Sequence, residues 1–242
     1  VISDLRAMDV AFGGQGAPIV PIGEKLLFED YSLFLNLGGI ANLSFHKKTD
    51  GNITVTAFDV CPCNRILNML AEQQGLEFDI DGKIAASGGV SEALLQQLNG
   101  LSHYQQDPPK SLDNNFGIDT IYPLLKSSGL SDEDCMRTYL EHIIQQITIS
   151  IKNNIKAVKN VKLLITGGGA FNTFLIEGLR KTLGEIDVSV DIPAEVVVQY
   201  KEALIMALIG VLRWREETNV LASVTGAAKD SIGGAFWLGT QV

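Results

Sequence analysis

Two glycine-rich turns in the sequence combine residue types that can bind a nucleotide. Leu163–Asn172 reads as a buried strand, the loop Gly167-Gly168-Gly169 and the start of a helix. Glycines let a backbone approach a ligand closely, and a helix N-terminus offers unpaired N–H groups to phosphate or ribose oxygens. The loop is not a Walker A loop, because no Gly-Lys-Ser/Thr follows it, and it fails GxGxxG, because Asn172 stands at the third glycine position. An ordinary tight turn between strand and helix is the alternative interpretation.

The second turn, Gly38-Gly39, lies within Asn36–Asn42 between two predicted strands. A simple hairpin turn would explain it, but two glycine turns at strand ends can face one cleft in a mixed sheet. A carboxylate, Asp59, follows a third strand just before a helix that begins at Asn64. Asp59 either flanks that helix as a cap or serves an active site.

A third candidate is Asp9, which precedes the glycine-rich string Gly13–Pro18. A carboxylate beside such a loop could act as a general base, held close to substrate where the backbone leaves room. The alternative is a surface pair between Asp9 and Arg6, and this segment by itself favours the pair.

Hydrophobic periodicity predicts the elements that position these residues. We expect strands over 32–37, 41–46, 53–58, 161–165 and 188–192, and helices over 64–74, 92–98, 131–156, 171–183 and 200–215. Asp50-Gly51 is the expected turn between the second and third strands. Residues 1–28 look too apolar for a flexible linker and too interrupted for a helix. Three antiparallel strands followed by alternating helices and strands predict a mixed sheet flanked by helices, the α/β pattern of a ribonuclease-H-like lobe.

Composition narrows the function classes. The 242 residues are 46% hydrophobic with a formal net charge of −9, which excludes a disordered chain and argues against a general nucleic-acid binder. Three cysteines cannot form a disulfide framework, and Cys61-Pro-Cys63 is poor metal spacing. The longest apolar run, Ala203–Leu212, is far short of the roughly 20 residues of a membrane span. With no signal peptide at Val1, we expect a soluble cytoplasmic protein.

Several strings occur in one collinear order. They are Asp4-Leu-Arg-Ala-Met-Asp-Val-Ala-Phe-Gly-Gly-Gln-Gly-Ala-Pro18, Asn36-Leu-Gly-Gly-Ile-Ala-Asn42, Phe58-Asp59 with Pro62 and Asn64, Pro109-Lys-Ser111, Gly167-Gly-Gly-Ala-Phe-Asn172, Lys201-Glu-Ala203 and Ser223-Val-Thr-Gly-Ala227. This order resembles the anhydro-N-acetylmuramic acid kinases of bacterial cell-wall recycling, from Val1 nearly to the C-terminus. That resemblance implies the sugar kinase–actin superfamily, in which two ribonuclease-H-like lobes close on ATP.

The resemblance also implies a reaction and its residues. Water opens the 1,6-anhydro ring while the 6-oxygen takes the γ-phosphoryl group of ATP, giving N-acetylmuramic acid 6-phosphate. Asp9 matches the catalytic aspartate, which overrides the preference for a pair with Arg6. The implied substrate-binding residues are Gly13, Gly14, Gln15, Asp59, Asn64 and Glu202, and the implied nucleotide-binding residues are Gly38, Gly39, Gly167, Gly168, Gly169 and Asn172. Mg²⁺ would accompany ATP without a metal ligand assigned to this chain, a homodimer is possible, and no nucleic-acid or membrane partner is expected.

Two departures from the family pattern leave alternatives open. The family's usual Asp-Thr-Gly-Pro-Gly-Asn reads Asp59-Val-Cys-Pro-Cys-Asn64, so sulfur atoms could project where backbone would lie bare. The family's N-terminal lobe, with its Gly-Thr-Ser phosphate-binding segment, has no counterpart in the sequence. We therefore expect residues 1–28 to be an active-site segment that joins the missing lobe and 29–242 to be the C-terminal lobe. A catalytically inactive sugar- or nucleotide-binding relative, or a superfamily kinase for another sugar, remains the alternative.

Overall fold

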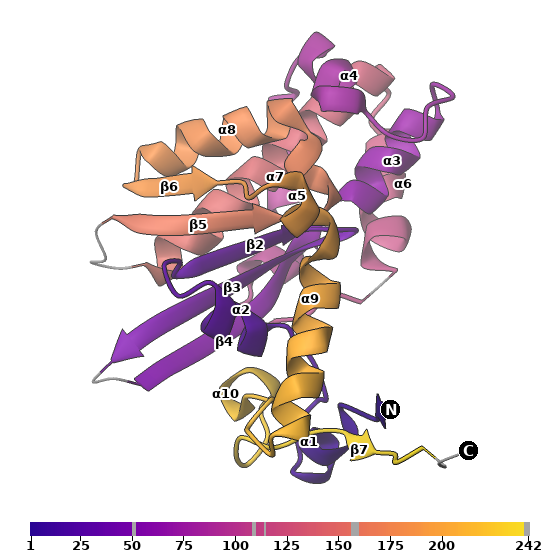
Figure 1. Cartoon of the computed structure of the whole chain (residues 1–242). Helices are drawn as coiled ribbons and strands as arrows, with labels where there is room; N and C mark the ends of the chain where they lie inside the picture. The colour runs from indigo at the N-terminus through magenta and orange to yellow at the C-terminus, as the bar shows by residue number, and fades with distance from the viewer. Residues whose placement is uncertain (50–51, 108–109, 114, 156–159, 240–242) are drawn as a thin grey trace. The chain divides into compact units, whose positions relative to one another are not determined.

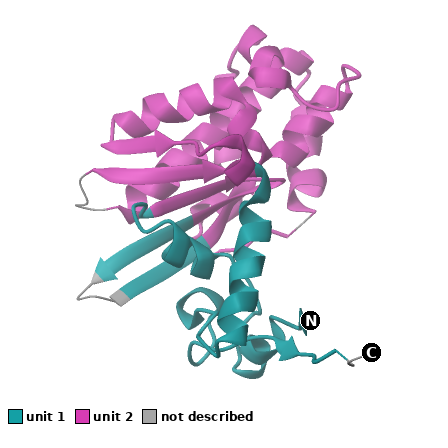
Figure 2. Ribbon diagram, viewed as in Figure 1, with its two compact units in different colours: residues 1–32, 44–57, 199–242 teal, residues 33–43, 58–198 magenta. Residues whose placement is uncertain are grey.

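A computed structural model of the chain describes residues 1–49, 52–107, 110–113, 115–155 and 160–239. These residues divide into two compact units (Figure 2). Unit 1 comprises 1–32, 44–57 and 199–242, and unit 2 comprises 33–43 and 58–198. The predicted turn at Asp50–Gly51, the motif proline Pro109 and the predicted helix end at Lys156 lie outside the described residues.

A five-stranded sheet has the strand order β4-β3-β2-β5-β6 (Figure 1). The strands are β2 (Leu33–Leu37), β3 (Ile40–Thr49), β4 (Asn52–Pro62), β5 (Val161–Thr166) and β6 (Val188–Asp191). Neighbouring strands β2 and β3 are antiparallel, because a connection of only Gly38 and Gly39 cannot return the chain to the starting edge. Strand β2 pairs in parallel with β5, and β5 pairs in parallel with β6. The predicted mixed sheet and ribonuclease-H-like strand order are confirmed.

The register of the central strands brings the two glycine turns to one edge of the sheet. Strands β2 and β5 are nearly continuous apolar runs, buried except at the half-buried Asn36 and the exposed Lys162, as expected for central strands covered on both faces. Asn36 lies opposite Thr166. Because the two strands are parallel, the turns that follow them, Gly38-Gly39 and Gly167-Gly168-Gly169, leave the sheet at the same edge.

Helices complete unit 2 around a long central one, α7 (Asp132–Asn154). The others are α3 (Asn64–Glu72), α4 (Lys83–Ser87), α5 (Glu92–Asn99), α6 (Tyr122–Ser127) and α8 (Thr173–Gly184), with α8 connecting β5 to β6. Helix α7 contacts α3, α4, α5 and α8. Its buried side includes Met136, Tyr139, Ile143 and Ile147, which recur every three or four residues as one helical face requires.

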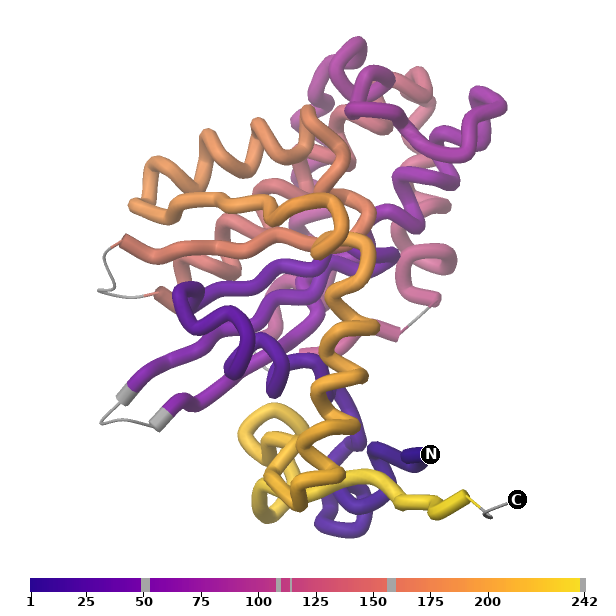
Figure 3. The backbone as a smooth tube through the Cα atoms, viewed as in Figure 1, coloured from indigo at the N-terminus to yellow at the C-terminus, as the bar shows by residue number. Residues whose placement is uncertain are grey.

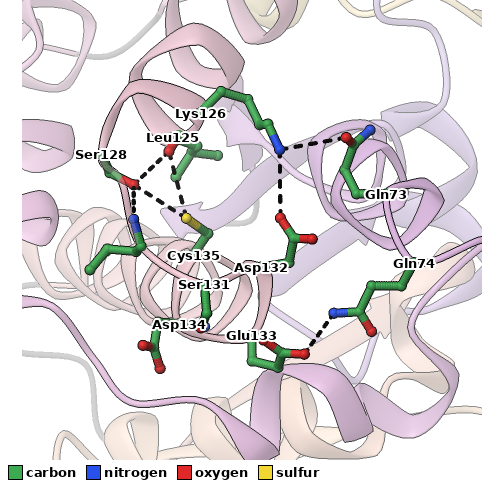
Figure 4. Close-up of polar contacts among 11 residues, drawn as sticks. Gln73, Gln74, Leu125, Lys126, Ser128, Ser131, Asp132, Glu133, Asp134 and Cys135 are labelled. Atoms are coloured by element: carbon green, nitrogen blue, oxygen red, sulfur yellow. Dashed lines mark hydrogen bonds and ion pairs between the residues drawn. The ribbon is translucent and has the colours of Figure 1, made fainter.

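The start of α7 is capped by the side chain of Ser131 (Figure 4). Ser131 Oγ accepts a hydrogen bond from the Asp134 N–H over 3.1 Å, which satisfies one unpaired donor of the first turn. Neighbouring helices attach to the same turn: Lys126 lies 3.6 Å from the Asp132 carboxylate, and Gln74 donates to Glu133 over 2.9 Å. These contacts join α6 and the segment that follows α3 to the beginning of α7.

Unit 1 is built from segments far apart in the sequence. It contains β1 (Ile2–Ser3), α1 (Ala7–Ala11), α2 (Pro21–Leu27), most of α9 (Glu195–Trp214), α10 (Ala222–Thr225) and β7 (Ala235–Phe236). Ile2 pairs antiparallel with Phe236, so the two terminal segments run side by side (Figure 3). Its apolar core joins Ile22 of α2 to Ile205 and Ile209 of α9.

The expectation that residues 1–28 hold no helix is wrong. Helix α2 begins at Pro21, because a proline in the first turn lacks only an N–H that would be unpaired anyway. Gly23 lies inside the same helix, and a Cβ there would come within 2.4 Å of Ile205. The glycine therefore permits close packing of α2 against α9. Among the described residues, no helix is both long and apolar enough to cross a bilayer.

Candidate active site

Asp9, the predicted general base, lies on α1 with its side chain completely enclosed. The Thr225 hydroxyl donates to Asp9 Oδ1 over 2.6 Å, and the Gly16 N–H donates to Oδ2 over 2.8 Å. Two donors on two oxygens suit an ionised carboxylate, which only accepts hydrogen bonds. Arg6 instead donates to the Gly16 carbonyl over 3.0 Å, so the surface pair considered for Arg6 and Asp9 is not formed.

The glycine-rich loop after α1 closes around this carboxylate. A Cβ on Gly14 would lie 2.2 Å from Asp9 Oδ2, so only glycine leaves the carboxylate its place. Gly13 has a φ of +83°, in the left-handed region that favours glycine. Gln15 is exposed, and its N–H donates to the Thr225 carbonyl over 3.0 Å. Of the three predicted residues in this loop, Gly14 lies against the Asp9 carboxylate, and the substrate role of Gly13, Gly14 and Gln15 stays a prediction.

A buried ion cluster in unit 1 joins helix α2 to helix α9. Lys201 of α9 lies 2.9 Å from Glu24 of α2, and His46 lies 3.7 Å from the second Glu24 oxygen. Burial alone would raise the pKa of Glu24, but the His46 imidazole and the Lys201 ammonium together hold that pKa below its ordinary value. Glu202, the predicted sugar ligand, follows Lys201 but is exposed, and it makes no hydrogen bond or ion pair within the described part of the chain.

In unit 2, the Gly167-Gly168-Gly169 loop lies against the end of β2. A Cβ on Gly167 would come within 2.6 Å of Asn36 Oδ1, and one on Gly169 would come within 2.6 Å of the Leu37 side chain. Gly168 differs, because it is exposed and a Cβ there would meet only Asn64 Nδ2, at 3.4 Å. Gly167 and Gly169 thus hold the loop in shape, while Gly168 presents bare backbone to the outside.

The turn Gly38-Gly39 connects directly to the start of α3. The Cys63 N–H donates to the Gly39 carbonyl over 2.8 Å, and the Asn64 N–H donates to the Gly38 carbonyl over 3.0 Å. The Asn64 side chain also donates to the Leu37 carbonyl over 2.8 Å. Asn64 therefore joins both glycine turns, since its side chain reaches the end of β2 and also borders Gly168 and Gly169.

The Asp59 carboxylate accepts hydrogen bonds from two groups that lie outside the helix that follows it. Asn42 donates from its side-chain amide to Asp59 Oδ1, and the Leu112 N–H donates to Oδ2 over 2.8 Å. Helix α3 begins at Asn64 without a side-chain cap, so the interpretation of Asp59 as its cap is wrong. Asn172, by contrast, caps α8 by accepting from the Leu175 N–H over 3.0 Å, so its oxygen already has one local partner.

The two cysteines that depart from the family pattern are interior. Cys61 and Cys63 have no exposed surface. Burial raises the pKa of the Cys61 thiol well above its ordinary value and that of Cys63 to about 12. Their sulfur atoms do not project onto the surface of unit 2, so the obstruction that the sequence suggested is absent at these two positions.

Sequence reasoning missed three residues that hold these groups: Thr225, Asn42 and Lys201. Each occurs inside a motif string quoted above, but its partner is distant in sequence, 216 residues away for Thr225 and Asp9. Membership of these motif strings was the one feature of the sequence that could have pointed to the three residues. Among the residues that the structure describes, no group of three or more His, Cys, Asp or Glu side chains could hold a metal ion.

Comparisons with known proteins agree with this arrangement of motifs. A family model described as anhydro-N-acetylmuramic acid kinase matches residues 1–239. The curated anhydro-N-acetylmuramic acid kinase of Mannheimia succiniciproducens is 33% identical over 247 residues, covering 97% of this chain and 65% of that protein. The one from Sulfurimonas denitrificans is 30% identical over 248 residues, covering 98% of this chain and 66% of that protein.

Solved structures give weaker likenesses. Component A of the Acidaminococcus fermentans (R)-2-hydroxyglutaryl-CoA dehydratase matches with a TM-score of 0.46 and 17% identity, covering 75% of this chain and 62% of that one. A xylulose kinase from Rhodospirillum rubrum matches with a TM-score of 0.42 and 13% identity, covering 67% of this chain and 35% of that one. Likenesses of this size support no functional comparison.

Proposed function

The chain belongs to the anhydro-N-acetylmuramic acid kinase family, and from this premise we propose that the protein containing it converts 1,6-anhydro-N-acetylmuramic acid, water and ATP into N-acetylmuramic acid 6-phosphate and ADP. The chain spans 66% and 65% of the length of the two curated relatives, so the activity is proposed for the protein that carries this chain.

In the proposed reaction, water attacks the anomeric carbon and the bond from that carbon to O6 breaks. O6 takes the γ-phosphoryl group as the bond from phosphorus to ADP breaks, and Asp9 accepts the proton that the water loses. The observation that carries this role is the Asp9 carboxylate itself, held by Thr225 and Gly16 and bordered by glycine backbone. A carboxylate has about four lone-pair sites, so two hydrogen bonds leave lone pairs that can accept a proton.

The nucleotide is proposed to lie at the edge of unit 2 where β2 and β5 end. Exposed backbone at Gly168, beside Gly38 and Gly39, supports this position, because phosphate and ribose oxygens need close approach to backbone N–H groups. Mg²⁺ usually binds through one or two carboxylates together with substrate phosphates.

The test is an assay of the protein containing this chain with ATP and Mg²⁺. Three sugars are compared: 1,6-anhydro-N-acetylmuramic acid, N-acetylmuramic acid and N-acetylglucosamine. We expect only the anhydro sugar to be converted. Its product should be heavier than the sugar by one water and one phosphoryl group, a difference that mass spectrometry resolves. A kinase for another sugar would add only a phosphoryl group to one of the other two, and an inactive relative would bind without turnover.

One feature weighs on these alternatives. The enclosed thiols of Cys61 and Cys63 remove one reason to suspect an inactive relative.

A homodimer remains part of the proposal, and analytical ultracentrifugation of the same protein would measure it.

A further inference from the structure

We propose that Thr225 is the positioning residue for the Asp9 carboxylate. This inference rests on the proposed function, in which Asp9 is the general base. The Thr225 hydroxyl lies 2.6 Å from Asp9 Oδ1, although 216 residues separate the two, and both side chains are buried. A hydroxyl at this distance fixes the plane in which a carboxylate presents its free lone pairs.

The hydroxyl has one proton and two acceptors within reach. Asp9 Oδ1 lies at 2.6 Å, and the Leu221 carbonyl, one turn back along α10, lies at 3.4 Å. An ordinary buried threonine near a helix end would donate to that carbonyl. The shorter contact to a carboxylate is also the stronger one, because hydrogen bonds to charged groups are about twice as strong as neutral ones. The distances therefore assign the proton to Asp9.

Thr225 is itself fixed by the loop that surrounds Asp9. Its carbonyl accepts from the Gln15 N–H over 3.0 Å, and its hydroxyl oxygen accepts from the Ala227 N–H over 3.4 Å. The Ala228 N–H donates to the Phe12 carbonyl over 3.0 Å. The segment after α10 and the glycine-rich loop after α1 are thus tied together on both sides of the Thr225–Asp9 contact.

Asp9 needs this support because its own helix supplies little. Helix α1 has five residues and no side-chain cap, so local structure does not hold its register. One carboxylate oxygen is held by a backbone N–H of the following loop, and the other by Thr225. Without the hydroxyl, the carboxylate can rotate about the remaining Gly16 contact, and the attacking water loses a fixed acceptor.

The experiment compares Thr225→Val, which keeps the shape but removes the hydroxyl, with Thr225→Ser, which keeps the hydroxyl. For Thr225→Val we expect kcat for the anhydro sugar to fall about 10- to 100-fold, the range of one hydrogen bond to a charged group. KM for sugar and ATP should stay within about twofold, since neither ligand contacts Thr225 in the proposal. Thr225→Ser should recover most of kcat. The control, Thr218→Val, alters a threonine that makes no hydrogen bond within the described residues.

An unchanged kcat in Thr225→Val, or a kcat in Thr225→Ser as low as in Thr225→Val, would overturn the proposal. In an Asp9→Asn background, Thr225→Val should lower kcat no further, because the base it positions is already gone. A full additional loss there would show that Thr225 acts elsewhere.

A second measurement separates this inference from the proposed function. Urea unfolding of Asp9→Ala, Thr225→Val and the double variant gives a cycle that needs no turnover. We expect the two effects on unfolding to be clearly non-additive, and additive effects would refute the contact. If the unaltered protein turns over none of the three sugars, the proposed function fails while the cycle still decides whether Thr225 holds Asp9.

Discussion

The Lys201 ammonium lies 2.9 Å from the Glu24 carboxylate, and both side chains are about 5% exposed. This buried pair joins α9 to α2 and points Lys201 into unit 1. The next residue on the helix, Glu202, consequently faces outward. Lys201 shares the buried side of α9 with Ile205 and Ile209, which leaves the predicted sugar ligand on the exposed side.

Removing one partner of this pair should destabilise unit 1 strongly. In Lys201→Met, Glu24 keeps a buried charge without its main counter-charge, and we expect a loss of about 3–5 kcal/mol in the free energy of unfolding. The matched control is Lys126→Met, which breaks an exposed pair with Asp132 and should cost at most about 1 kcal/mol. Urea denaturation measures both variants, and equal losses would contradict the role given to burial.

Acid should weaken the same cluster. Because the pKa of Glu24 is lowered in the folded protein, its contribution to stability is present above its ordinary pKa of about 4.3 and is lost as pH falls below that value. As pH is lowered below about 4.3, the urea concentration at the midpoint of unfolding should therefore decrease more steeply for the unaltered protein than for Glu24→Gln. Parallel pH curves for the two proteins would show that Glu24 does not carry this dependence.

The glycine loop after β5 can be tested at the one glycine that packing leaves open. Gly168→Ala should fold normally, since its Cβ meets only Asn64 Nδ2 at 3.4 Å, whereas Gly167→Ala and Gly169→Ala collide with the end of β2. Gly168→Val should weaken binding of a non-hydrolysable ATP analogue at least tenfold, because it covers the backbone proposed to face the nucleotide. Calorimetry measures the affinity, and tight binding by a folded Gly168→Val protein would remove the loop from the nucleotide site.

The interior cysteines should resist thiol reagents. Burial raises the pKa of Cys61 and brings that of Cys63 to about 12, so neither is a thiolate at pH 8. Ellman's reagent should label the native protein slowly and the urea-unfolded protein at all three cysteines. Ser223→Cys, at an exposed position of α10, should add one fast-reacting thiol. Rapid labelling of Cys61 or Cys63 in the native state would place a sulfur at the surface after all.

Asp9 and Glu202 should fail in different ways. Asp9→Asn should lower turnover at saturating substrate by at least about 10²–10⁴-fold, the usual size of positioned proton transfer, with sugar binding little changed. Glu202→Gln should chiefly raise KM for the sugar, since an exposed carboxylate on α9 is proposed to hold a hydroxyl. Steady-state kinetics of both variants decide the matter. Near-normal turnover in Asp9→Asn together with lost turnover in Glu202→Gln would show that Asp9 is not the general base.

The sheet and its neighbouring helices could be predicted because their signal is local. Buried strands such as Val161–Thr166 are short apolar runs, and α7 begins at a serine cap followed by acidic residues. Each pattern lies within a few residues of the structure it specifies. The predicted and observed bounds of these elements accordingly differ by only a few residues.

The structure of unit 1 was harder to predict from the sequence, because it depends on contacts between residues that are far apart in the chain. Pro21 and Gly23 look like helix breakers, but one begins α2 and the other admits Ile205 of α9. Asp9 likewise could be placed beside a glycine loop from the sequence, while Thr225 could not be recognised as its partner. Contacts across roughly two hundred residues leave no periodic trace in either segment.

The pairing of Ile2 with Phe236 has a consequence for the order of events during synthesis. Most of unit 2 is one contiguous stretch, 58–198, and domains generally fold as units while the chain emerges from the ribosome. Unit 1 draws on 1–32, 44–57 and 199–242, so its first segment must wait for its last. A nascent chain stalled once residue 198 has left the ribosome should therefore protect β5 and α7 from protease while leaving Asp9 and its loop open to cleavage.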